Sequence, residues 1–175
     1  SFEQRFEEIR NIPLLIMDDF GTQNATSWAQ EKLFQILNYR YINQLATVIT
    51  SNNPLSSFEG RIRSRLMDPE LVTRVEILAP DYRNPTDDIG HPELSTLSLH
   101  SKQTFGTFSL RRNEDIDPND LASLKEAFEA AQAFAQNPQG WLVFLGPYGC
   151  GKTHLAAAIG NYQAGLGFPP LMVVV

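Results

Sequence analysis

A glycine-rich stretch late in the chain, "GPYGCGKTH" at residues 146–154, constrains the fold more than any other feature of this sequence. It fits the pattern G-x-x-x-x-G-K-[ST] and lies between the apolar run "GWLVFL" and the helix-forming run "HLAAAIGNYQAG". This order of strand, loop and helix is the context in which the pattern binds phosphate. Glycines 149 and 151 can adopt positive φ, so backbone N–H groups can approach an anion at the positive end of the helix.

The residue types of this loop suit a bound nucleotide triphosphate. Lys152 is expected to reach the β- and γ-phosphates, and the hydroxyl of Thr153 is expected to bind Mg²⁺. Cys150 is more simply explained as a small side chain in a tight loop than as a redox group, whose reactivity would depend on its thiol pKa. The predicted nucleotide-binding residues are Gly146, Pro147, Tyr148, Gly149, Cys150, Gly151, Lys152, Thr153 and His154.

Composition limits what surrounds this loop. At 175 residues and 42% hydrophobic content, the chain suits one compact domain over residues 1–175. It has no apolar run of the roughly 18 residues needed to cross a bilayer, and "SFEQRFEEIR" has no secretory segment, so we expect a soluble cytoplasmic protein without a membrane partner. One cysteine and three scattered histidines argue against a disulfide or structural zinc. The net charge of −6 disfavours non-specific nucleic-acid binding, although "RIRSR" at 61–65 is densely basic.

Five apolar or β-branched runs alternate with helical patterns along the chain. The expected strands lie near residues 12–17, 46–53, 72–78, 140–145 and 170–175, and the expected helices near 2–10, 27–44, before Pro69, 119–136 and after 152. The segment 81–103 is predicted to be a loop or linker, and "TFGTFSL" a short edge segment that packs two phenylalanines. Helical spacing predicts core positions in the second helix at Trp28, Leu33, Phe34, Leu37, Tyr41 and Ile42. The result is an α/β sandwich with ligands at the carboxyl ends of its strands.

Two of these strands end in polar residues that complete a hydrolytic site. "LLIMDD" ends in Asp18 and Asp19, and hydrolysis needs one carboxylate for Mg²⁺ and another to orient water. We therefore expect Asp18 to bind the Mg²⁺ shell and Asp19 to polarise the attacking water. The next strand ends in Thr50, Ser51 and Asn52, of which the Asn52 amide best suits a sensor of the γ-phosphate.

Together these segments resemble AAA+ ATPases of the bacterial helicase-loader group, the DnaC/DnaI-like proteins, with the transposition helper IstB as a relative. The resemblance covers most of the chain through "TFGTFSL", "GPYGCGKTHLAAAI", "LLIMDDFG", "NYRYINQLATVITSN", "RIRSRL" and "DYR". It implies a three-layer P-loop NTPase fold with a five-stranded parallel sheet in the order 5-1-4-3-2, and the cofactors ATP and Mg²⁺. It also implies that Arg65 is an arginine finger that reaches a neighbouring subunit, with Arg61 as a helper, and that Arg83 lies near the nucleotide.

The motif order is rotated relative to that family. The acid pair, sensor and finger occupy residues 1–83, a linker spans 84–103, and the phosphate loop lies in 104–175. Joining Val175 to Ser1 restores the family order, and the implied strand order puts both ends on neighbouring strands. A circular permutation, a span across two tandem modules and numbering out of biological order all explain the rotation. The absence of an initiator methionine suggests part of a larger protein.

The resemblance favours a slow ATPase module of a helicase loader, stimulated by self-association or single-stranded DNA. A replicative helicase is an implied partner, but through a domain that these residues do not contain. An IstB-like transposition helper is the close alternative. Asp19, where many relatives in the wider superfamily carry glutamate, keeps a non-hydrolysing nucleotide-dependent switch open. A metabolic kinase fits less well, because no acceptor-binding lid is evident.

Overall fold

The computed structural model describes residues 2–21, 26–78 and 95–175, and Arg83 lies outside these ranges. Two 3₁₀ turns, η1 (Leu55–Ser57) and η2 (Leu97–His100), join the regular elements. The helices and strands are α1 (Phe2–Asn11), β1 (Leu14–Asp18), α2 (Ser27–Ile42), β2 (Ala46–Ser51), α3 (Gly60–Leu66), β3 (Val72–Glu76), α4 (Pro118–Gln136), β4 (Trp141–Leu145), α5 (Lys152–Gly165) and β5 (Leu171–Val174).

The strands form one parallel sheet in the order β3-β4-β2-β1-β5. Numbered from β4, the strand before the phosphate loop, this is the predicted order 5-1-4-3-2. The predicted α/β fold is therefore confirmed. β5 pairs with β1 through Leu15↔Leu171, so the first and last strands of the chain are neighbours, as expected.

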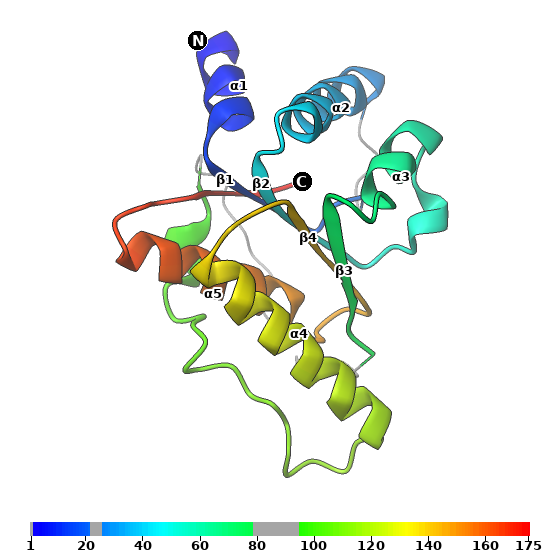
Figure 1. Cartoon of the computed structure of the whole chain (residues 1–175), viewed down its shortest axis with the longest axis vertical. Coiled ribbons are helices and arrows are strands. Elements are labelled where there is room, and N and C mark those ends of the chain that lie inside the picture. The colour runs from blue at the N-terminus through cyan, green and yellow to red at the C-terminus, as the bar shows by residue number, and fades with distance from the viewer. Residues whose placement is uncertain (1, 22–25, 79–94) are drawn as a thin grey trace.

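Helices cover both faces of this sheet (Figure 1). α1, α2 and α3 lie on one face, and α4 and α5 on the other. β1 and β2 are buried along their whole length, which explains why both are nearly continuous apolar or β-branched runs. β3 lies at the sheet edge and buries only Val72 and Val75, whereas its other three residues are exposed, so the strict alternation that its sequence suggested does not occur.

Two core predictions on α2 are wrong. Trp28 is 59% exposed and Ile42 is 67% exposed, whereas Leu37 in the middle of the helix is buried. Both exposed residues lie in the terminal turns of α2, where periodicity gives the direction of a side chain but not whether a neighbour covers it.

The segment "TFGTFSL" is also not a strand. Phe108 N and Thr107 N both donate to Thr104 O, so the backbone forms a turn that local hydrogen bonds close. The predicted packing of its two phenylalanines does occur, because Phe105 and Phe108 lie partly buried against the core and contact the ring of Phe128. Just before this segment, η2 packs against α5 and β5.

Candidate nucleotide-binding site

The glycine-rich loop connects β4 to α5 with the backbone conformation that its glycines predict. Gly149 has φ +69° and Gly151, which precedes the first turn of α5, has φ +106°. At Gly146 a Cβ atom would lie 2.2 Å from Ile77 O, so only glycine fits there. The loop therefore wraps the N-terminus of α5, where backbone N–H groups and the helix dipole favour an anion.

Lys152 is buried within this loop, with 4% of its surface exposed. Its ammonium donates to Gly146 O at 3.0 Å and Pro147 O at 2.6 Å, and lies 3.6 Å from Cys150 Sγ. The carbonyls of the loop thus hold the Lys152 ammonium in place. None of these contacts is with a carboxylate, so none of them neutralises its charge.

Asp18 and Thr153 are 135 residues apart in the sequence and meet at this loop. Thr153 Oγ1 donates to Asp18 Oδ1 at 2.9 Å, and Thr50 Oγ1 donates to the same oxygen at 2.6 Å. Asp18 is 3% exposed, and burial raises its pKa above the usual range, while both hydroxyl bonds oppose that rise. The contact joins the acid-pair half of the chain to the phosphate-loop half.

Asp19 follows Asp18 with a different orientation. Its φ of +56° is a left-handed conformation that aspartate tolerates, and it turns the side chain toward the pocket. Asn52 Nδ2 donates to Asp19 Oδ1 at 3.3 Å. Of the three polar residues that end β2 or follow it, Asn52 lines the pocket, whereas Thr50 and Ser51 are buried and bond to Asp18 and Phe20.

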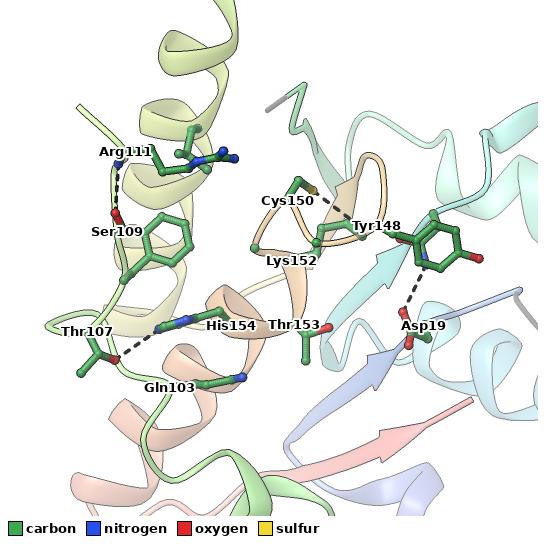
Figure 2. A pocket seen from close by; sticks show the side chains of 15 residues that line it. Asp19, Gln103, Thr107, Ser109, Arg111, Tyr148, Cys150, Lys152, Thr153 and His154 are labelled. Atoms are coloured by element: carbon green, nitrogen blue, oxygen red, sulfur yellow. Dashed lines mark hydrogen bonds between the residues drawn. The ribbon is translucent and has the colours of Figure 1, made fainter. Parts of the chain in front are cut away.

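These groups border a cavity of about 330 Å³, shown in Figure 2. Residues 148–154 form one wall, with Asp19 and Asn52 beside them. The opposite wall was not predicted as part of the site, although it includes the segment "TFGTFSL". Its residues are Gln103, Thr107, Phe108, Ser109, Arg111 and Leu124.

His154 attaches this second wall to α5. Its Nε2 lies 3.0 Å from Thr104 O and 3.3 Å from Thr107 Oγ1, and its ring meets Phe108 edge to face. Burial lowers the pKa of His154, which favours the neutral imidazole at this position. The sequence predicted that the two phenylalanines of "TFGTFSL" pack, but it held no pattern that placed them beside the phosphate loop.

Cys150 is 3% exposed, and burial raises the pKa of its thiol despite the nearby Lys152. A buried thiol with a raised pKa has little thiolate at neutral pH. The environment therefore supports a packing role for Cys150 in the loop.

Of the three arginines predicted to act on a nucleotide, Arg61 and Arg65 do not line the cavity. Arg65 lies on α3, where it bonds to Asn38 and to the carbonyl of Arg61. Arg61 pairs with Glu59 at 2.6 Å. The prediction for Arg83 falls outside the described residues.

A phosphate loop between β4 and α5, next to the acid-bearing tip of β1 in this parallel sheet, defines a P-loop nucleotide-binding domain. Residues 1–78 match the family of IstB-like ATP binding proteins. The chain is 31% identical over 151 residues to the chromosomal replication initiator protein DnaA of Lacticaseibacillus casei, covering 73% of this chain and 33% of that protein.

Two Bacillus subtilis proteins also match. The phage-like element PBSX protein XkdC is 29% identical over 85 residues, covering 46% of this chain and 30% of XkdC. The replicative helicase loader DnaI is 23% identical over 100 residues, covering 53% of this chain and 32% of DnaI. The chain spans about a third of the length of these curated relatives. No solved structure matches significantly.

Fold, site and matches together identify the chain as an AAA+ domain of the group that contains helicase loaders and IstB-like ATP-binding proteins. Among the residues that the structure describes, no helix is long and apolar enough to cross a membrane.

Proposed function

We propose that this domain binds ATP with Mg²⁺ and hydrolyses it, as the ATPase module of a DNA replication helicase loader. The observation that carries the proposal is the 2.9 Å contact between Thr153 Oγ1 and Asp18 Oδ1. A hydroxyl after the phosphate-loop lysine and a strand-end carboxylate are the two protein ligands that hold Mg²⁺ in P-loop NTPases.

The donor set fits a hard divalent cation. Thr153 and Asp18 offer oxygen atoms, which Mg²⁺ prefers, and the buried Asp18 carboxylate gains a counter-charge when a cation binds beside it. Bound Mg²⁺ would neutralise charge on the phosphates. Lys152 would exchange its bonds to the carbonyls of Gly146 and Pro147 for phosphate oxygens.

Two further residues suit water and phosphate. Asp19 lines the cavity beside the phosphate loop, where its carboxylate would orient the attacking water. Asn52 holds Asp19 through its amide and would sense the γ-phosphate. Phe108 and the other residues of the second wall, which lies opposite the phosphate loop, would enclose the adenine ring of ATP.

Arg65 would act on the nucleotide of a neighbouring copy. It lines no part of its own pocket, and none of the described carboxylates forms an ion pair with it, so its charge is available to an external anion. This assignment makes self-association a requirement for rapid turnover.

The test separates binding from hydrolysis. Lys152→Ala is expected to abolish nucleotide binding, whereas Arg65→Ala should leave binding intact and lower phosphate release at least tenfold. Arg63→Ala is the matched control, because Arg63 is exposed on the same helix. Fluorescent-nucleotide titration and phosphate release measure the two effects, and equal loss of binding in both variants would contradict this division of roles.

Phosphate release by the wild-type chain, measured with and without single-stranded DNA, tests whether the domain hydrolyses ATP or only binds it as a switch. Saturable ATP binding without phosphate release under either condition would favour a nucleotide-dependent switch.

An IstB-like transposition helper is the second candidate, and the family match over residues 1–78 favours it. The similarity to DnaI and DnaA favours a role in replication. Pull-down of a replicative helicase against a transposase, with ATP present, separates the two. Retention of the transposase alone would reject the loader assignment.

A further inference from the structure

The guanidinium of Arg65 is held by a specific set of neutral groups. Nε donates to Asn38 Oδ1 at 3.1 Å, Nη2 donates to the same oxygen, and Nη1 donates to Arg61 O at 2.7 Å. The guanidinium carbon Cζ of Arg65 lies 4.9 Å from the ring centre of Phe34 and 5.5 Å from that of Tyr41. One oxygen thus binds one edge of the guanidinium, while two rings of α2 line its face.

The neighbouring arginine has the opposite environment. Arg61 lies against Phe34 at 4.3 Å, but its Nε contacts Glu59 Oε1 at 2.6 Å and its Nη2 lies 3.8 Å from Glu31. Two carboxylates therefore offset the charge of Arg61. Among the described residues none forms an ion pair with Arg65, although the two side chains share a helix and an aromatic ring.

We propose that Asn38 is the positioning residue for Arg65, so that an amide oxygen orients the guanidinium without neutralising it. The inference rests on the proposed finger role of Arg65. A guanidinium has five N–H groups, and three hydrogen bonds fix its plane while leaving the others for a phosphate of the neighbouring copy. A fixed orientation matters because transition-state charge is stabilised most by donors that need no reorganisation.

The amide is what makes this arrangement effective. Asn38→Asp keeps an oxygen at the same place but adds a negative charge in contact with the guanidinium. The resulting ion pair would keep the Arg65 side chain against α2 and offset the positive charge that would stabilise the phosphate of the neighbouring copy. Asn38→Ala removes the anchor and leaves the charge, so it should be the milder change.

The experiment measures steady-state phosphate release and nucleotide affinity of the 175-residue chain. Asn38→Asp is expected to lower kcat about tenfold and Asn38→Ala about threefold, with KM and Tm close to wild type. Gln35→Glu is the control for charge, because it makes the same chemical change at an exposed position on the same helix, and it should change kcat less than twofold.

The double variant Asn38→Asp with Arg65→Ala distinguishes positioning from a general structural role. If Asn38 acts through Arg65, the double variant should be no slower than Arg65→Ala alone, because residues that act as a unit are not additive. A further tenfold loss in the Arg65→Ala background, or an unchanged kcat in Asn38→Asp, would overturn the inference while leaving the finger intact. An unchanged kcat in Arg65→Ala would instead refute the finger role, and this inference with it.

Discussion

Replacing Arg40 with alanine tests how α1 is attached to the sheet. Arg40 lies on α2, is fully buried, and forms no ion pair among the described residues. Its donors reach Ala46 O at 2.6 Å, Ile12 O at 2.8 Å, Arg10 O at 3.0 Å and Thr47 Oγ1 at 3.0 Å. The side chain therefore satisfies carbonyls at the end of α1 and at the start of β2, which would otherwise be buried without a donor.

The magnitude follows from two opposing terms. A hydrogen bond from a charged donor contributes at least about 1.5 kcal/mol, so the four bonds of Arg40 stabilise the fold by about 6 kcal/mol. Burial lowers the pKa of Arg40 from its usual range to about 10, which corresponds to a cost of about 3 kcal/mol. The guanidinium is charged in both folded and unfolded chains at neutral pH, so this cost is fully present there. The net contribution is about 3 kcal/mol, and truncation costs about 3–5 kcal/mol because it also orphans the carbonyls.

Urea unfolding at neutral pH measures this loss against Arg5→Ala, which removes an exposed arginine of α1. Arg40→Ala should lower Tm by about 6–20 °C, and hydrogen exchange should accelerate in α1. Arg5→Ala should change stability by less than about 0.5 kcal/mol. A loss below about 1 kcal/mol for Arg40→Ala would refute the reasoning.

Two other substitutions test the site through stability. Asp18→Asn should stabilise the nucleotide-free domain by about 0.5–2 kcal/mol, because it removes a buried charge while keeping an oxygen for both hydroxyl donors. The gain should be present at neutral pH and should shrink as pH falls through the raised pKa of Asp18, since wild type then takes up a proton; thermal melts that show no gain at neutral pH would contradict it. Gly151→Ala should destabilise by about 1–3 kcal/mol, because φ is +106° and the new Cβ would lie 2.9 Å from the ring of Phe108. Gly165→Ala, in open space at the last residue of α5, should stabilise by about 0.4–1 kcal/mol, and equal unfolding midpoints for the two alanine variants would be the adverse result.

Much of the fold could be predicted because its signals are local. Buried parallel strands such as β1 read as apolar runs, and the carboxyl ends of parallel strands meet at one edge, so the polar tips of β1 and β2 had to lie near the phosphate loop. The strand order came from the family resemblance, since hydrophobic pattern alone does not fix which strands pair.

The missed features depend on tertiary contacts. The second wall of the cavity is held to α5 by His154 and by Asn161, which donates to His100 O and Gln103 O, and no sequence period marks such bonds. Arginine is usually a surface residue, but Arg40 is buried and bonds to backbone carbonyls at the end of α1 and at the start of β2. The Asn38–Arg65 contact joins residues 27 apart, and only the packing of α2 against α3 reveals it.

The central claim is that two halves of the chain hold one magnesium nucleotide, and a double-mutant cycle between Asp18 and Thr153 tests it most directly. ATP affinity is measured with and without Mg²⁺ for Asp18→Asn, Thr153→Val and the double variant. The account predicts that each single change removes most of the Mg²⁺-dependent affinity and that the double variant loses little more, a coupling of at least about 1 kcal/mol. Additive losses within about 0.5 kcal/mol, or affinity that does not respond to Mg²⁺ in the wild type, would contradict it.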